Sequence, residues 1–180
     1  PLVDAAPEYE RPWTAPPLEA LDALGGRLGP RMQRALARLR DRLRLHPDAT
    51  PGYFDHPMAL PVLALPHWIA REGCPEARVR AAAEAAALGY LHVRVHDDLL
   101  DEGEADADSL MLANVLLHAH RSALTLAAGG AAGFEAHADA VWFAYAEAMS
   151  LEAALRAGAL PWGDETTAAA MDRSMPLALP

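Results

Sequence analysis

The sequence predicts an all-α protein, a helical bundle around one core. Of its 180 residues, 52% are hydrophobic, with Ala and Leu dominant and few β-branched runs, and this composition favours helix over sheet. Apolar side chains recur at helical spacing, and no stretch alternates with the period of a strand. Pro and Gly divide the chain into about six helical segments, which suits a bundle.

The Pro-rich residues 1–17 predict an extended N-terminal arm, followed by a single α-helical domain over 18–180. Pro61 and Pro66 lie inside an apolar segment, so that segment is expected to be kinked or to form two short pieces. In order, the expected helices are 18–24, about 30–45, 58–70, about 76–102, about 109–128, about 132–157 and 165–174.

The helix ends carry the residues that commonly start or stop helices. Gly25-Gly26 is expected to end the first helix, and Pro30 opens the second, where its fixed φ suits a first turn. Asp108 is the expected N-cap of the helix over 109–128, and Asp164 that of the last helix. The chain begins at Pro1 and ends at Pro180, so we treat it as a candidate fragment of a longer domain.

Charge and cysteine content exclude some classes of function. The formal net charge of −10 argues against a nucleic-acid partner, because phosphate backbones are bound by clustered Lys and Arg. Cys74 is the single cysteine, so no internal disulfide can form, and a reducing compartment is expected. No apolar run is long enough for a transmembrane segment, and no signal-peptide pattern is present. These observations favour a cytoplasmic protein.

Arginines are concentrated in the helix over about 30–45. They alternate with apolar residues at helical spacing, which favours a solvated basic face over a surface for phosphate or a partner protein. The arginines are Arg31, Arg34, Arg38, Arg40, Arg42 and Arg44.

The sequence 91–103, LHVRVHDDLLDEG, places three aspartates, Asp97, Asp98 and Asp101, within five positions at the end of the longest expected helix. Asp97 and Asp101 are four residues apart and therefore share a face, where like charges repel. The helix dipole also disfavours acids at a C-terminus. A divalent cation such as Mg²⁺ would reverse this cost, since it prefers oxygen ligands. Arg94 can instead pair with Asp98 at i,i+4, so spacing alone leaves both a metal site and a solvated helix end open.

The run HDDLLDEG resembles the first aspartate-rich motif of the class I isoprenoid synthase superfamily, most closely that of trans-prenyl diphosphate synthases. The resemblance covers about residues 76–128 and implies an isoprenoid-synthase type of bundle. It implies that Asp97 and Asp101 bind Mg²⁺ ions bridging an allylic prenyl diphosphate, with Asp98 supporting them. It also implies that Tyr90, His92 and Val93 line the substrate pocket, although His92 fits a hydrogen-bonded core histidine equally well.

Other motifs of that superfamily are missing. The G-K-R and R-R-G motifs, which bind the second substrate of chain-elongating members, are replaced by sequences without Lys or Arg at 55–61 and 104–109. The nearest candidate for the second metal motif is Gly163-Asp164 with Thr167, which we interpret as a helix cap. Cyclisation or diphosphate removal, reactions of terpene cyclases and related lyases, needs no second substrate.

Other candidate residues are less informative. His118 and His120 point to different sides of a helix and cannot share a metal. His92 and His96 are at i,i+4, but no third Zn²⁺ ligand is evident at suitable spacing. The aromatic residues Trp142, Phe143 and Tyr145 are expected to pack in the core or an interface rather than to line a cation-stabilising pocket.

Two hypotheses follow from these patterns. The first is a Mg²⁺-dependent class I isoprenoid enzyme that ionises an allylic prenyl diphosphate, by prenyl transfer or by cyclisation, with its catalytic residues beyond the metal ligands unassigned. The second is a non-catalytic interaction or regulatory subunit that retains a prenyl synthase fold. The resemblance implies a homodimer or a heteromeric synthase partner.

Overall fold

The computed structural model describes residues 15–47, 54, 60–70, 72–101 and 106–171. Within these ranges the chain forms seven helices and no strand, which confirms the all-α prediction. The helices are α1 (Ala15–Arg27), α2 (Pro30–Leu43), α3 (Leu60–Ile69), α4 (Glu76–Asp101), α5 (Ala107–Ala128), α6 (Phe134–Arg156) and α7 (Asp164–Met171).

Helix α1 is longer than predicted at both ends. It begins at Ala15 and includes Pro16 and Pro17, so the arm predicted over 1–17 does not extend through these residues. Proline is tolerated there because the first helical turn has no intrahelical use for its N–H. The helix also continues through Gly25-Gly26, which were expected to end it. The rest of the predicted arm, 1–14, lies outside the described residues.

The cap of α5 differs from the prediction. Asp106, not Asp108, is the N-cap, and its carboxylate accepts hydrogen bonds from the Asp108 N–H at 2.7 Å and the Ser109 hydroxyl at 2.6 Å. These hydrogen bonds lower the pKa of Asp106. Asp108 lies in the first turn, where a negative charge is favoured by the helix dipole.

Two further predictions concern Pro66 and Asp164. Helix α3 keeps Pro66 inside it, within the segment expected to be kinked. Asp164 lies in the first turn of α7 rather than capping it. The Gly163 N–H, one residue before the helix, donates to Thr166 Oγ1 at 2.9 Å.

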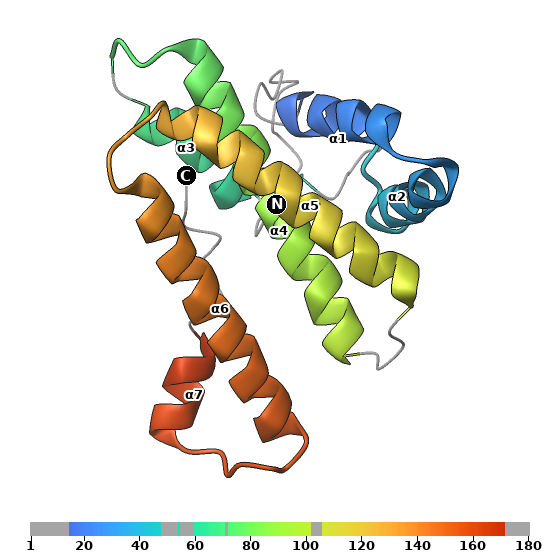
Figure 1. Ribbon diagram of the computed structural model, residues 1–180, viewed down its shortest axis with the longest axis vertical. Coiled ribbons are helices and arrows are strands. Elements are labelled where there is room, and N and C mark those ends of the chain that lie inside the picture. The colour runs from blue at the N-terminus through green and yellow to red at the C-terminus, as the bar shows by residue number, and fades with distance from the viewer. Residues whose placement is uncertain (1–14, 48–53, 55–59, 71, 102–105, 172–180) are drawn as a thin grey trace, which may run out of the picture.

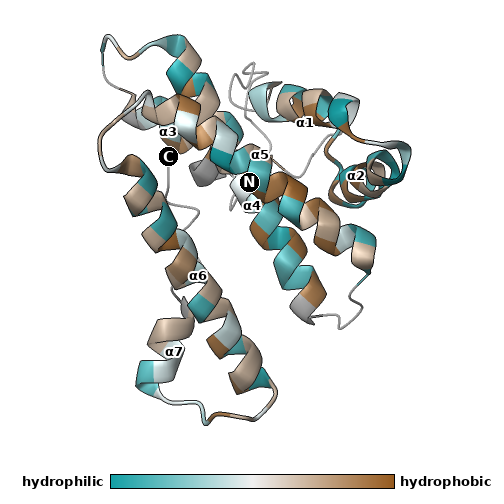
Figure 2. Cartoon of the chain, viewed as in Figure 1, coloured by the Kyte–Doolittle hydropathy of each residue, from teal (hydrophilic) through white to brown (hydrophobic). Residues whose placement is uncertain are grey.

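Helices α4 and α5 lie side by side at the centre of the molecule (Figure 1). Helix α1 packs on α4 and α2 packs on α5, while α3 packs on α4. Helix α6 then leads away from this bundle, with α7 beside it (Figure 1). The alternation of apolar and polar residues along α1 and α2 is visible in Figure 2, as expected for helices that cover a core.

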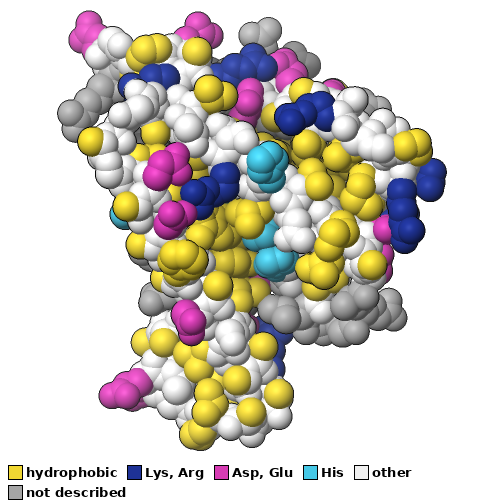
Figure 3. Space-filling view, viewed as in Figure 1, with side chains coloured by type: hydrophobic (Ala, Val, Ile, Leu, Met, Phe, Trp, Pro, Cys, Tyr) yellow, Lys and Arg dark blue, Asp and Glu magenta, His cyan; other side chains and the backbone are white. Residues whose placement is uncertain are grey.

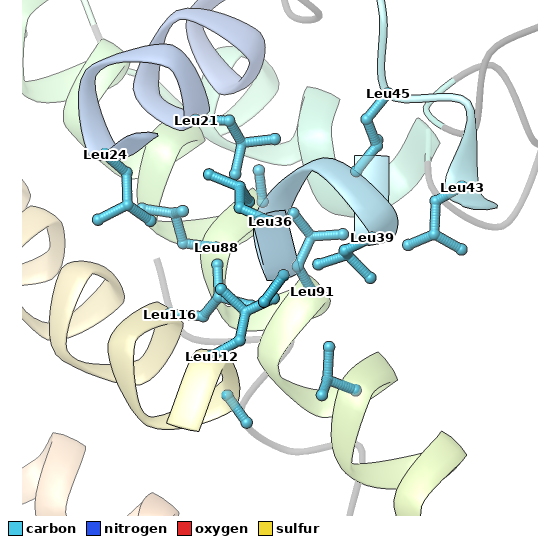
Figure 4. Packing of buried hydrophobic residues seen from close by; sticks show 14 of the residues in the cluster. Leu21, Leu24, Leu36, Leu39, Leu43, Leu45, Leu88, Leu91, Leu112 and Leu116 are labelled. Atoms are coloured by element: carbon cyan, nitrogen blue, oxygen red, sulfur yellow. The ribbon is translucent and has the colours of Figure 1, made fainter. Parts of the chain in front are cut away.

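A leucine-rich core joins α1, α2, α4 and α5, and its side chains point toward one another in Figure 4. Leu21, Leu91 and Leu116 have no measurable exposed surface. Burying one such side chain contributes about 1.5–3 kcal/mol. This core fixes the position of α4, whose last turn carries the aspartate motif. None of the described helices is long and apolar enough to span a bilayer.

Candidate functional site

The aspartate motif occupies the last turns of α4. Asp97 is half-buried, and its Oδ1 atom is shielded from solvent. Asp98 is half-buried on an adjacent face of the helix. Asp101 is the final residue of α4, and its side chain lies outside the described part of the structure. Asp97 and Asp101 both lie within α4, four residues apart.

Asp98 forms a double ion pair that links α4 to α2. Its Oδ1 lies 2.8 Å from Arg94 Nη2, the predicted i,i+4 pair, and its Oδ2 lies 2.6 Å from Arg42 Nη2. The contact with Arg42 is an ion pair that lacks hydrogen-bond alignment. The carboxylate of Asp98 is thus already neutralised by two guanidinium groups.

The arginines of α2 pair with the acidic ends of both central helices. Besides Arg42, Arg31 Nε lies 2.6 Å from Asp108 Oδ1, and Arg38 Nη2 lies 3.5 Å from Asp108 Oδ2. Their side chains remain largely exposed, consistent with a solvated face, yet they also hold α2 against α5. The helical pattern alone did not predict these partners.

Asp98→Asn is expected to lower the free energy of unfolding by about 1 kcal/mol, since two ion pairs to a half-buried carboxylate are weakened. The loss should shrink in 1 M NaCl, measured by urea unfolding. Asp22→Asn is the matched control, because its carboxylate pairs with Arg40 but is 61% exposed. Equal losses for the two variants would contradict this prediction.

The three residues predicted to line a pocket lie at different positions on α4. Val93 is buried one turn before Asp97 on the same face, and Tyr90 is half-buried one turn further back. His92 lies on another side of the helix, where its exposed fraction is 1% and its Nδ1–H donates to the Ala113 carbonyl of α5 at 2.9 Å. His92 therefore has the environment of a core histidine.

Histidine and aromatic rings form a connected cluster between α4, α5 and α6. Trp142 lies edge-on to both His92 and His120, each with ring centroids 5.2 Å apart. Tyr145 stacks on His96 at a centroid distance of 6.2 Å, and its hydroxyl lies 3.2 Å from His96 Nδ1. The rings of His92 and His96 also contact each other, with centroids 4.2 Å apart. This cluster lies beside the aspartate motif and joins α6 to the bundle.

The three histidines of the cluster are held neutral by burial. Desolvation lowers the pKa of His92 to about 4, assisted by repulsion from His96, and it also lowers the pKa of His96. Burial likewise lowers the pKa of His120, whose Nδ1–H donates to the Ala85 carbonyl at 2.7 Å. Because a carbonyl only accepts, the proton of His92 and of His120 resides on Nδ1. Each Nε2 therefore carries a lone pair.

The aromatic residues and the other histidines are divided between the core and the surface. Trp142 and Tyr145 are buried, as expected for packing, whereas Phe143 is 72% exposed. His118 is exposed and His120 is buried, so the two do point to different sides of α5. The contact of Trp142 with two histidines was not predicted, because it depends on how three helices cross.

The donor set at the end of α4 suits magnesium in type but is only partly described. Carboxylate oxygens are the ligands that Mg²⁺ prefers, and Asp97 presents one at a half-buried position. Asp98 is engaged by two arginines. Among the side chains that the structure describes, no three His, Cys, Asp or Glu are grouped to hold a metal ion. The Asp101 side chain and residues 102–105 are not among the described residues.

Comparisons of this chain with protein-family models, with curated proteins and with solved structures found no match.

Proposed function

We propose that this chain is a Mg²⁺-dependent class I isoprenoid enzyme, or part of one, that ionises an allylic prenyl diphosphate. The observation that supports it best is the pair Asp97 and Asp101, four residues apart at the C-terminal end of a long helix. Repulsion between two carboxylates at this spacing and the helix dipole both disfavour the placement, and a bound cation would offset both. A local conflict of this kind is common at functional sites.

The residues around Asp97 have the properties that such a reaction needs. In the proposal, Asp97 and Asp101 hold Mg²⁺, which would stabilise the negative charge of the departing diphosphate. Val93, one turn before Asp97, is buried with Trp142 and Tyr145 packed against it, and in the proposal this apolar cluster would keep water from the allylic group.

Release of inorganic diphosphate tests the proposal. Geranyl, farnesyl and geranylgeranyl diphosphate are each supplied with Mg²⁺ or with EDTA. Release is expected only with Mg²⁺ and is expected to be lost in Asp97→Asn, because the amide provides a weaker ligand of nearly the same shape. Asp41→Asn, which removes an exposed carboxylate on α2, should leave release unchanged. Adding isopentenyl diphosphate distinguishes prenyl transfer from cyclisation, since only transfer requires it.

No Mg²⁺-dependent release from any of the three substrates, by a chain that is folded by circular dichroism, would exclude the enzyme. The second candidate, a non-catalytic subunit with the same fold, would then be favoured. A specific feature supports it: large apolar side chains are exposed on α6 and in the loop before α7, among them Phe143, Leu160 and Trp162. Apolar side chains are visible over this part of the molecule in Figure 3. A partner chain would cover them.

A further inference from the structure

We propose that a groove between the α1–α2 elbow and the first half of α5 binds an amphiphilic anion, a hydrocarbon chain that ends in an anionic head group. Asp97 and the other residues of the aspartate motif do not line this groove within the described structure. The inference therefore goes beyond the proposed function and requires neither Mg²⁺ nor an allylic group.

The floor of the groove is apolar. Leu28, Met32, Val115 and Ala119 are half-buried residues that pack on the main core, and their outer surfaces face the groove. Met111 also lines the groove and is 47% exposed. The groove has a volume of about 810 Å³, which is in the range of sites that bind ligands of drug size.

The rim of the groove carries positive charge in a chain whose formal net charge is −10. Arg27, in the last turn of α1, and Arg31, in the first turns of α2, both line it. Asp108 also lines it, but its carboxylate is already paired with Arg31 and Arg38. Among the lining residues two guanidinium groups, those of Arg27 and Arg31, are present with one carboxylate, that of Asp108, which leaves a net positive charge.

An apolar floor with arginines on one rim matches one kind of ligand. Arginine presents several N–H donors in a planar fork and binds carboxylate or phosphate oxygens through two of them. The pairing with Asp108 holds Arg31 in place and so lowers the entropy lost when an anion binds. The hydrocarbon chain would lie on Met32, Met111 and Val115, where methionine adapts to chains of different shape.

Binding of two amphiphiles to the full chain tests the inference, by calorimetry in EDTA. Farnesyl diphosphate and oleate are both amphiphilic anions, but they differ in head group and chain. The one that binds more tightly shows which kind of amphiphile the groove prefers. The double variant Arg27→Gln/Arg31→Gln is expected to weaken binding by about tenfold or more, equivalent to 1.4 kcal/mol. Met111→Gln is expected to weaken binding of both ligands by about threefold to tenfold, since it makes the floor polar.

Arg34→Gln is the matched control, because Arg34 lies on α2 with the same charge but outside the described lining of the groove. Asp97→Asn should also bind both ligands normally, which separates this site from the aspartate motif. The inference is overturned if neither amphiphile binds the wild-type chain, or if the groove variants and the control bind equally. It is also overturned if Met111→Gln turns a dimer into a monomer in sedimentation while no amphiphile binds, because the groove is then an interface between copies.

Discussion

Gly89→Ala is expected to lower the free energy of unfolding by about 1–3 kcal/mol, the usual cost of overpacking a core. Alanine has the higher helix propensity, so in an open position the same change would stabilise the helix by about 1 kcal/mol. At Gly89, however, an added Cβ would lie 2.7 Å from Nδ1 and 2.9 Å from Cε1 of His120 on α5.

His120 cannot easily move away from that methyl group. Its Nδ1–H donates to the Ala85 carbonyl, one turn before Gly89, and its ring is fully buried against Trp142. Gly89 therefore allows α4 and α5 to approach closely at this level, and a side chain there must either break the hydrogen bond or separate the two helices.

Urea unfolding of Gly89→Ala beside Gly26→Ala measures this effect. Gly26 is also helical, but an added Cβ there meets nothing within 4 Å, so Gly26→Ala should leave stability unchanged or raise it slightly. The double variant Gly89→Ala/His120→Ala should be less destabilised than the sum of its single changes, because removing the imidazole removes the clash. Strict additivity would show that the close contact with His120 is not the cause.

The second large effect is acid sensitivity. Stability is expected to fall by about 2 kcal/mol between pH 7 and pH 5 through His92 alone. Its pKa in the folded chain is about 4, against an ordinary value of 6.5, so below pH 6.5 the unfolded state binds more protons than the folded state. The loss of stability therefore begins near pH 6.5 and levels off near pH 4. At pH 7 and above, His92 does not change the free energy of unfolding with pH. His120, whose pKa is lowered in the same way, adds to the loss.

His92→Asn isolates this contribution. Asparagine does not titrate, and its amide N–H can replace Nδ1–H as the donor to the Ala113 carbonyl. Unfolding free energies at pH 7 and pH 5 should differ less for this variant than for the wild type. The exposed His118→Asn is the control and should retain the full pH dependence. If wild type and His92→Asn lose stability in parallel, the acid sensitivity lies elsewhere.

Much of the secondary structure could be predicted from local signals. Pro30 is the first residue of α2, where the proline ring fixes φ. Helix α5 ends just before Gly129, which adopts the left-handed conformation. Helix ends were mispredicted where two neighbouring residues could both act as the cap, or where tertiary packing determined the length of the helix. Asp106 and Asp108 are both good caps, and only the path of the chain selects Asp106. Gly25-Gly26 stays helical although glycine usually favours a helix end.

The surroundings of the motif were less predictable than its position. Helical spacing predicted the Arg94–Asp98 pair, because both residues lie on one helix. It did not predict Arg42, which reaches Asp98 from a helix 56 positions earlier in the chain. The neutral state of His92 likewise depends on burial between helices, which no local pattern encodes.

The attachment of α6 has a consequence for the order in which the molecule opens. This helix meets the bundle through a small cluster of Val93, Trp142, Tyr145 and Met149, with Phe134 packed separately at its first turn. The leucine core of α1, α2, α4 and α5 is a different cluster. Amide hydrogens of α6 should therefore exchange with solvent through partial opening, while those of the central helices require global unfolding. Acid should lower the free energy of this partial opening, since the histidines that must charge lie under α6.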